Sequence, residues 1–282
     1  MNYLDDMRDD EGIEPQAAEK PWAALYVQSD DCNIKAHREE ACVRVRDYFE
    51  QNCPLPEESR VACIFAKDDC IKSQLNRDVA ARGLFLAPVE GLDLTCFPPY
   101  VHDIVAPIDQ RTSECAFPYA GMILLHGSTC ETDIGLTLTF AHELQHFLQY
   151  TNAKPLWVMN KLLMCLHNEE FKVWWDFPVE VEARVTAKKV AECLFGAELV
   201  REHIKEKIKA RITCDDAKDW EFVQGIVSSV PYNLGDCTRP LVRRHRRQLD
   251  ELRQRCQEDA DALRCCGLQI EDLADIDFDA LT

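Results

Sequence analysis

The sequence predicts an α+β fold, with an N-terminal mixed α/β part that contains a small sheet and a mostly helical C-terminal part. Between Pro21 and Gly127, short runs of branched and apolar residues alternate with stretches of helical spacing. From Gly135 onward, apolar residues recur at intervals of three and four, as in helices. A chain of 282 residues is long enough for one large domain or two small ones.

The N-terminal part is expected to supply the strands of the sheet. Branched and apolar runs predict strands over Trp22–Gln28, Arg60–Ala66 and Gly121–His126, of which the last (GMILLH) is the clearest. Helical spacing predicts helices over His37–Phe49 and Ile71–Arg82. Leu84–Pro107 contains five prolines or glycines, which predicts an irregular segment with at most one strand.

The C-terminal part is expected to be helical throughout. Its first helix covers Gly135–Tyr150, and Thr132 or Asp133 can cap that helix. Further helices are expected over Ala153–His167, Val179–Phe195, Ala197–Ile212, Trp220–Val227 and Leu241–Cys266. The tail, Glu271–Thr282, alternates acidic and apolar residues and is either a short docked helix or a frayed end.

Charge and composition restrict the partners and the compartment. A net charge of −18 disfavours nucleic acid and anionic membranes as partners, because both require a positive surface. The seven arginines of Arg239–Arg255 are either a surface for an acidic partner or a solvated helix paired with acidic neighbours, and we favour the second. The first twenty residues lack the features of a signal peptide, and the fifteen cysteines include no CxxC pair. We therefore expect a soluble cytoplasmic protein.

The strongest motif in the chain is His142-Glu-Leu-Gln-His146. On a helix, residues four apart point the same way, so His142 and His146 can bind one ion. Glu143 lies about 100° round the helix from His142, where it can act as a general base toward water on that ion. The surrounding residues are mostly apolar, and two histidines and a glutamate in a buried helix would be costly without a partner.

A catalytic zinc site needs a third protein ligand, since such sites have three ligands and a water. The later histidines, His167, His203 and His245, do not fit the spacing of the longer three-histidine motif, whose positions hold Gln149 and Asn152 here. A carboxylate from the helix that begins at Pro178 is the alternative, and Glu180 and Glu182 both lie in its first turn. The residues leave these two open.

Leu138–His146 (LTFAHELQH) and Glu180–Ala187 (EVEARVTA) resemble the two motifs of the gluzincin metallopeptidases, and of the ImmA/IrrE-like family in particular. The resemblance implies a zincin-like fold, a Zn²⁺ cofactor held by His142, His146 and Glu180, and Glu143 as the catalytic base. Glu182 is the possible alternative ligand, because a Glu-Ala pair contains the ligand in thermolysin-like enzymes. The chain departs from the family's motifs at two positions. Gln145 replaces a glycine, and Arg184 replaces the Asp or Asn that often orients a ligand histidine.

The resemblance also implies the activity, a zinc metalloendopeptidase acting on a protein or peptide substrate. The alternative is a catalytically inactive zincin-fold binding or regulatory module. The expected organisation is an acidic, flexible N-terminus (1–20), a zincin-like catalytic core (21–196), a helical region (197–270) and an acidic tail (271–282). The resemblance further implies that Gly121–His126 forms the cleft edge and pairs with an extended substrate, and the alternative is an internal strand. Candidate oxyanion donors are Tyr150, Arg184, His203 and Tyr232.

Overall fold

The computed structural model of the chain describes residues 23–26, 32–53, 61–66, 83–87, 121–126, 132–166, 176–210, 214–274 and 276. The strands are β1 (Ala23–Tyr26), β2 (Val61–Ala66), β3 (Gly83–Leu86) and β4 (Gly121–His126). The helices are α1 (Cys32–Asn52), α4 (Asp133–Asn152), α5 (Lys154–Leu166), α6 (Pro178–Phe195), α7 (Ala197–Ala210), α8 (Cys214–Gly225), α9 (Leu234–Arg244), α10 (Arg246–Glu258), α11 (Ala260–Cys265) and α12 (Ile270–Ala274). The expected helix Ile71–Arg82 and the acidic segment 1–20 lie outside the described residues.

The four strands form one mixed sheet in the order β1-β2-β4-β3. β1, β2 and β4 are parallel, whereas β3 runs antiparallel to β4, with Phe85 opposite Ile123. β4 therefore lies inside the sheet, and the expectation that Gly121–His126 forms its edge is wrong. Residues 122–125 of β4 are fully buried, as an unbroken apolar run in an internal strand should be. Among the described strands, β3 is the edge strand on that side, and it comes from the start of the segment expected to be irregular.

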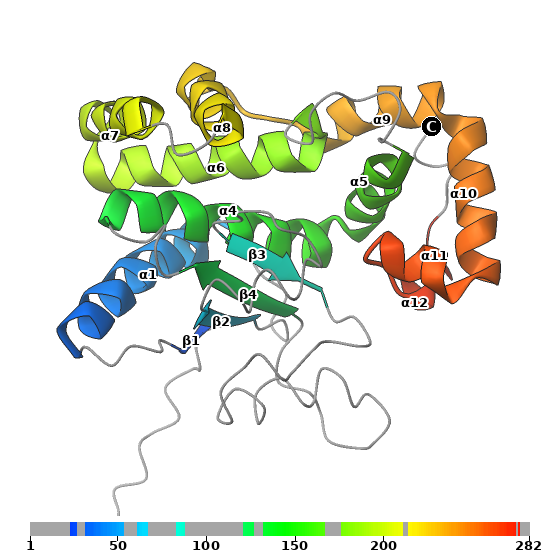
Figure 1. The fold of residues 1–282 in the computed structure, drawn as a ribbon, viewed down its shortest axis with the longest axis horizontal. Coiled ribbons are helices and arrows are strands. Elements are labelled where there is room, and N and C mark those ends of the chain that lie inside the picture. The colour runs from blue at the N-terminus through cyan, green and yellow to red at the C-terminus, as the bar shows by residue number, and fades with distance from the viewer. Residues whose placement is uncertain are drawn as a thin grey trace, which may run out of the picture.

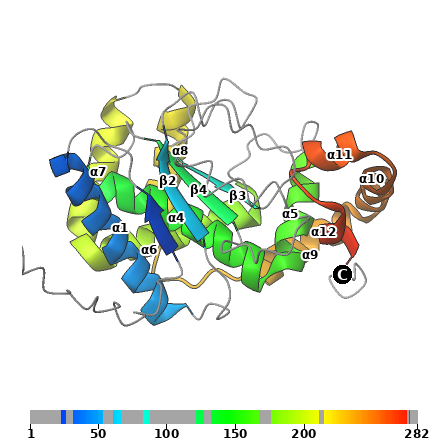
Figure 2. The same cartoon turned by 90° about the horizontal axis from the view of Figure 1, so that it is seen from below.

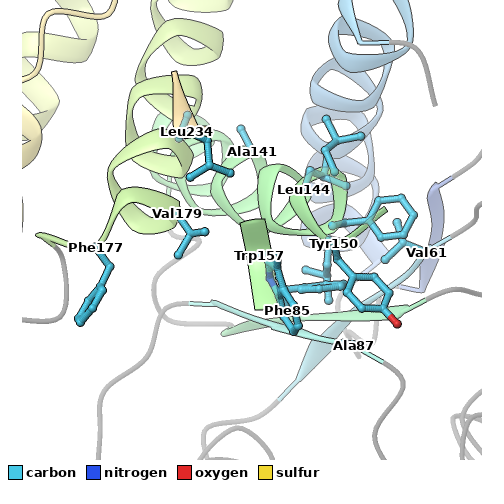
Figure 3. Packing of buried hydrophobic residues seen from close by; sticks show 14 of the residues in the cluster. Val61, Phe85, Ala87, Ala141, Leu144, Tyr150, Trp157, Phe177, Val179 and Leu234 are labelled. Carbon is cyan, nitrogen blue, oxygen red and sulfur yellow. The ribbon is translucent and has the colours of Figure 1, made fainter. Parts of the chain in front are cut away.

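The molecule is built in layers on this sheet. α1 and α4 cover one face of the sheet, α6 packs on the far side of α4, and α7 and α8 pack on α6 (Figure 1). The main core fills the space between α4 and the sheet, where Phe85, Tyr150 and Trp157 gather (Figure 3). The ring of Tyr150 lies 6.0 Å from that of Phe85 and 5.1 Å from that of Trp157. The predicted combination of a small sheet with mostly helical structure is confirmed.

α4 is the central helix, and its start was predictable. Thr132 is the N-cap, and its Oγ1 accepts a hydrogen bond of 3.1 Å from the backbone N–H of Gly135. The helix is buried on most sides by the sheet, α1, α5 and α6. Its burial extends to polar residues, since Glu143 and Gln149 are both buried. Polar groups in such a helix have to find partners within the protein.

The C-terminal helices pack around α5 at the end of the molecule away from α7 and α8 (Figure 2). Asn160 of α5 donates a buried hydrogen bond of 2.9 Å to Thr238 of α9. An ion pair of 2.8 Å between Lys154 and Asp272 joins α5 to α12. α12 is therefore docked, so the start of the expected tail is a short docked helix, while residues 277–282 lie outside the described residues. None of the helices in the described ranges is long and apolar enough to cross a bilayer.

The prediction of a single helix over Leu241–Cys266 is wrong. The first of its three pieces, α9, already begins at Leu234, because Asn233 caps it by accepting a 3.1 Å hydrogen bond from the backbone N–H of Asp236. The chain then turns at the buried His245 and again at Asp259, where α10 ends. Periodicity misses these turns, because the apolar spacing continues across them.

Candidate metal centre

The site lies where α4 and α6 cross. His142 and His146 project from α4 on one face, and Glu180 projects from the first turn of α6, which begins at Pro178 because the fixed φ of proline suits a first helical position. The two Nε2 atoms of the histidines lie 3.0 Å apart. Oε2 of Glu180 is 3.3 Å from Nε2 of His142, and Oε1 is 3.5 Å from Nε2 of His146. The side chains are only 15%, 12% and 9% exposed, in the order His142, His146, Glu180.

These separations suit a single tetrahedral ion. Two ligand atoms that are each 2.0–2.1 Å from a tetrahedral metal lie roughly 3.3 Å apart. The measured edges of 3.0, 3.3 and 3.5 Å match that value without any large movement. Among the described residues, this is the one group of three histidine, cysteine or acidic side chains close enough to share an ion. Two imidazoles and a carboxylate are a donor set for zinc and for several other transition metals.

Two of the three groups already have the net charge that metal binding requires. Burial lowers the pKa of His142 to about 4, so its ring is neutral at physiological pH. Burial alone would raise the pKa of Glu180, but the charge of His146 and hydrogen bonds from both histidines hold it well below its usual range. Burial opposes protonation of His146 too, but the charge and hydrogen bond of Glu180, the charge of Glu143 and the hydrogen bond of Gln149 together outweigh burial and raise the pKa of His146. His146 is thus the ligand on which a metal competes with a proton.

Glu143 lies against the edge strand. A Cβ at Gly83 would be 2.8 Å from Cγ of Glu143 and 2.9 Å from its Oε1, so only glycine permits this approach of β3. The backbone N–H of Phe85 donates a hydrogen bond to the Glu143 carboxylate. Burial nevertheless raises the pKa of Glu143 to about 7. The position that the motif assigns to a general base is therefore occupied by a carboxyl group that titrates near neutral pH.

Arg184 contacts the carboxylate of the trio. Its Nη1 donates to Oε2 of Glu180 at 3.0 Å, and its Nε donates to Oδ1 of Asp219 on α8 at 2.9 Å. Arg184 is buried, so both carboxylates compensate a charge that has little access to solvent. The sequence assigned no such contact to Arg184, although the spacing of four residues from Glu180 indicates a pair on one helix face.

Glu182 points elsewhere. Its Oε2 accepts hydrogen bonds from Gln149 at 2.8 Å and from Gln145 at 3.2 Å, both on α4. Of the two carboxylates that the sequence left open, the structure brings Glu180, and not Glu182, to the histidine nitrogens. Burial raises the pKa of Glu182. Sequence reasoning did not single out Gln149, which also contacts His146 and whose three-residue spacing from His146 was the available indication.

The remaining candidates are dispersed. Tyr150 packs in the core between Phe85 and Trp157, and His203 of α7 packs against Trp220 of α8 with their rings 5.9 Å apart. Burial raises the pKa of Tyr232, with a smaller contribution from the charge of Glu182. Among these candidates for an oxyanion donor, Arg184 is the one that the described contacts join to the trio. His167 lies outside the described residues, and His245 is the buried turn between α9 and α10.

No protein-family profile, curated protein or solved structure matches this chain. Its function therefore has to be inferred from its own residues and their geometry. Those residues form a buried cluster of two imidazoles and one carboxylate that could hold a metal ion, with a second carboxyl group beside the first histidine on the same helix.

Proposed function

We propose that this chain is a zinc-dependent metallopeptidase that hydrolyses peptide bonds of a protein or peptide substrate. The observation that carries the proposal is the convergence of His142, His146 and Glu180 at the edge lengths of a tetrahedral zinc site. A carboxyl group one residue after the first histidine gives the same helix a base as well as two ligands.

In this proposal His142, His146 and Glu180 hold the zinc. When bound, zinc lowers the pKa of a coordinated water and polarises the carbonyl of the scissile bond. Glu143 would take a proton from water as the water oxygen adds to the scissile carbonyl, and would deliver that proton to the leaving amine as the C–N bond breaks. Burial raises the pKa of Glu143 to about 7 in the metal-free protein, and a dication beside it lowers the pKa, which favours the ionised base near neutral pH. Gly83 and Phe85 keep the carboxylate oriented and shielded from bulk water.

We infer that an extended substrate would bind along β3 and not along β4. Within the described sheet, β4 is paired on both sides, whereas β3 is paired with β4 on one side. A peptide added to the free side of β3 would run past Gly83, whose backbone lies next to the carboxyl group of Glu143. Placing the peptide there brings the scissile bond close to the base.

One observation favours a catalytically inactive binding module instead. Arg184 supplies a positive charge to Glu180 at 3.0 Å, so the carboxylate is compensated before any metal is bound. In such a module the trio would stabilise the crossing of α4 and α6 without chemistry. The two functions differ in what they require of Glu143, because a module has no need of a base.

The test compares the wild type with Glu143→Gln. Elemental analysis of protein purified without added metal should show close to one zinc per chain in both, because the substitution keeps the size of the side chain and all three ligands. Cleavage of a proteome-derived peptide library, followed by mass spectrometry, should fall by about 10²–10⁴-fold in the variant, as expected for loss of a general base. His142→Ala is the control that should lose both zinc and cleavage.

Two results would end the proposal. One is a Glu143→Gln variant that cleaves the library as fast as the wild type. The other is a wild-type protein without metal whose stability His142→Ala leaves unchanged. If the Gln variant loses nothing in the cell and still binds its partners, the binding module takes the place of the enzyme.

A further inference from the structure

We propose that Gln149 and Glu182 together orient His146, by holding its imidazole in the tautomer with a proton on Nδ1 and a free lone pair on Nε2. This inference rests on the metal centre of the proposed function. It gives Glu182 a positioning role in place of a ligand role. It also supplies the orienting partner that the sequence left unassigned when Arg184 replaced the usual Asp or Asn.

The imidazole ring of His146 is in contact with the side-chain amide of Gln149. Nδ1 of His146 lies 2.7 Å from Oε1 of Gln149, one helical turn further along α4. An amide has an acceptor oxygen and a donor nitrogen, so its direction decides which atom of the ring carries the proton. The surroundings of Gln149 have to fix that direction.

Both groups around the side-chain nitrogen of Gln149 are hydrogen-bond acceptors. Nε2 of Gln149 lies 2.9 Å from the carbonyl oxygen of Val179 and 2.8 Å from Oε2 of Glu182. Reversing the amide would place its oxygen against two other oxygens, in a position that is 2% exposed. Such an arrangement leaves buried acceptors without donors and is costly. The oxygen of Gln149 therefore faces His146.

The direction of the amide determines where the ring of His146 carries its hydrogen. Because a carbonyl oxygen can only accept, Nδ1 of His146 carries the hydrogen. In the neutral ring the lone pair is then on Nε2, which lies 3.0 Å from Nε2 of His142 and 3.5 Å from Oε1 of Glu180. This is the nitrogen that has to face a shared ion. The amide thus keeps a proton on Nδ1, so that the proton which a metal displaces is the one on Nε2.

Glu182 connects this selection to the packing of the two helices. It is two residues from Glu180 on α6, and it binds Gln149 and Gln145 of α4 at 2.8 and 3.2 Å. The same stretch of α6 therefore places a carboxylate at the histidine nitrogens and a second carboxylate behind the amide that orients one of them. A shift of α6 along α4 would disturb both contacts together.

The experiment measures zinc affinity of the folded full-length chain by competition with a chelator. Gln149→Met keeps the size of the side chain but removes the acceptor, and it should weaken zinc binding about 10–100-fold, as loss of an orienting partner does. Gln145→Met is the matched control, because it removes another amide that donates to Glu182 without touching His146. It should change zinc affinity by less than about twofold, since the amide of Gln149 remains in place.

A rescue variant separates orientation from simple packing. Gln149→Glu places a second carboxylate against Glu182 and should lose affinity. Adding Glu182→Gln to that variant restores a donor between the two side chains while one carboxylate oxygen still accepts from His146. The carbonyl oxygen of Val179 still faces an oxygen of residue 149, so the double variant should recover only part of the zinc affinity lost in Gln149→Glu. A double variant that binds zinc more weakly than Gln149→Glu would contradict a role of the pair in orienting His146.

The tautomer is read directly by ¹⁵N NMR of the metal-free protein at a pH where the imidazole is neutral. The wild type should show His146 protonated on Nδ1, and Gln149→Met should show a mixture or the other tautomer. An unchanged tautomer, or unchanged zinc affinity in Gln149→Met, would overturn the proposal. If the wild type binds no zinc, the proposed function fails, yet the NMR result still decides whether Gln149 selects the tautomer.

Discussion

The crossing of α4 and α6 and the arginine-rich pair α9–α10 are both charged, but their charges are used differently. At the crossing, Glu143, Glu180 and Arg184 are buried and contact side chains or backbone of other elements. On α9 and α10, three exposed ion pairs join residues three or four apart on one helix, as between Arg246 and Asp250 at 3.0 Å. Burial and convergence, and not the number of charges, distinguish the candidate site from a charged surface.

The reason is the cost of removing a charge from water. Exposed pairs on one helix contribute about 0.3–0.5 kcal/mol each and need no special surroundings. A buried ion remains charged only where partners compensate it. The pairs on α9 and α10 agree with the interpretation of Arg239–Arg255 as a solvated surface. The absence of a nucleic-acid partner stays a prediction.

The largest effect should separate the two carboxylates of α6. Glu180→Ala removes one of the three ligands. It should weaken zinc binding by more than about a hundredfold, because losing a ligand costs more affinity than the 10–100-fold lost with an orienting partner. Glu182→Ala should lose only about tenfold, because the three ligands remain. Chelator competition measures both. The reverse order would make Glu182 the ligand, and loss from neither would refute a carboxylate ligand.

The next effect concerns the buried cation. Arg184→Met leaves Glu180 and Asp219 without their partner, and it should lower the free energy of unfolding of the metal-free protein by about 3 kcal/mol. Zinc should reduce that loss, because the metal compensates Glu180 in place of the guanidinium. Denaturant unfolding with and without zinc measures the difference. An equal loss in both forms would show that Arg184 does not act on the metal ligand.

The pH dependence of zinc binding should be steep below pH 6.5. The raised pKa of His146 means that binding releases its proton there, and this proton alone makes the affinity fall about tenfold per pH unit on acidification. Glu143, with a pKa of about 7, adds a second proton, so the wild type should fall about a hundredfold per pH unit and Glu143→Gln about tenfold. His142 contributes only below about pH 4. Isothermal titration in buffers of different ionisation enthalpy counts these protons, and a flat affinity between pH 6.5 and 4.5 would contradict a protonated His146 in the metal-free protein.

The smallest effect should come from the charged surface. Arg247→Ala breaks a 3.6 Å pair with Glu251 in which the side chains are 86% and 69% exposed. The free energy of unfolding should change by less than about 0.5 kcal/mol, because water solvates both groups. Thermal unfolding at low and high salt checks this value. A loss comparable to that of Arg184→Met would remove the distinction between the two regions.

The sequence by itself determined the local part of the site. His142 and His146 share a face because residues four apart on a helix differ by about 40° and one turn. The Thr132 cap, the start of α6 at Pro178 and the bounds of β4 likewise follow from residues close in sequence. Each of these features depends on backbone geometry within a few residues, which the order of residues states directly.

The tertiary structure decided which side chains meet across elements. Glu180 rather than Glu182 reaches the histidines, Gln149 meets Val179 and Glu182, and β3 rather than β4 forms the edge. The hydrogen bonds of Gln149 to α6 join residues 30 and 33 positions apart, so they depend on how α6 lies along α4. That register is set by the packing of buried side chains over the whole crossing, because close-packed interiors allow few alternatives. Spacing along one helix contains no information about it.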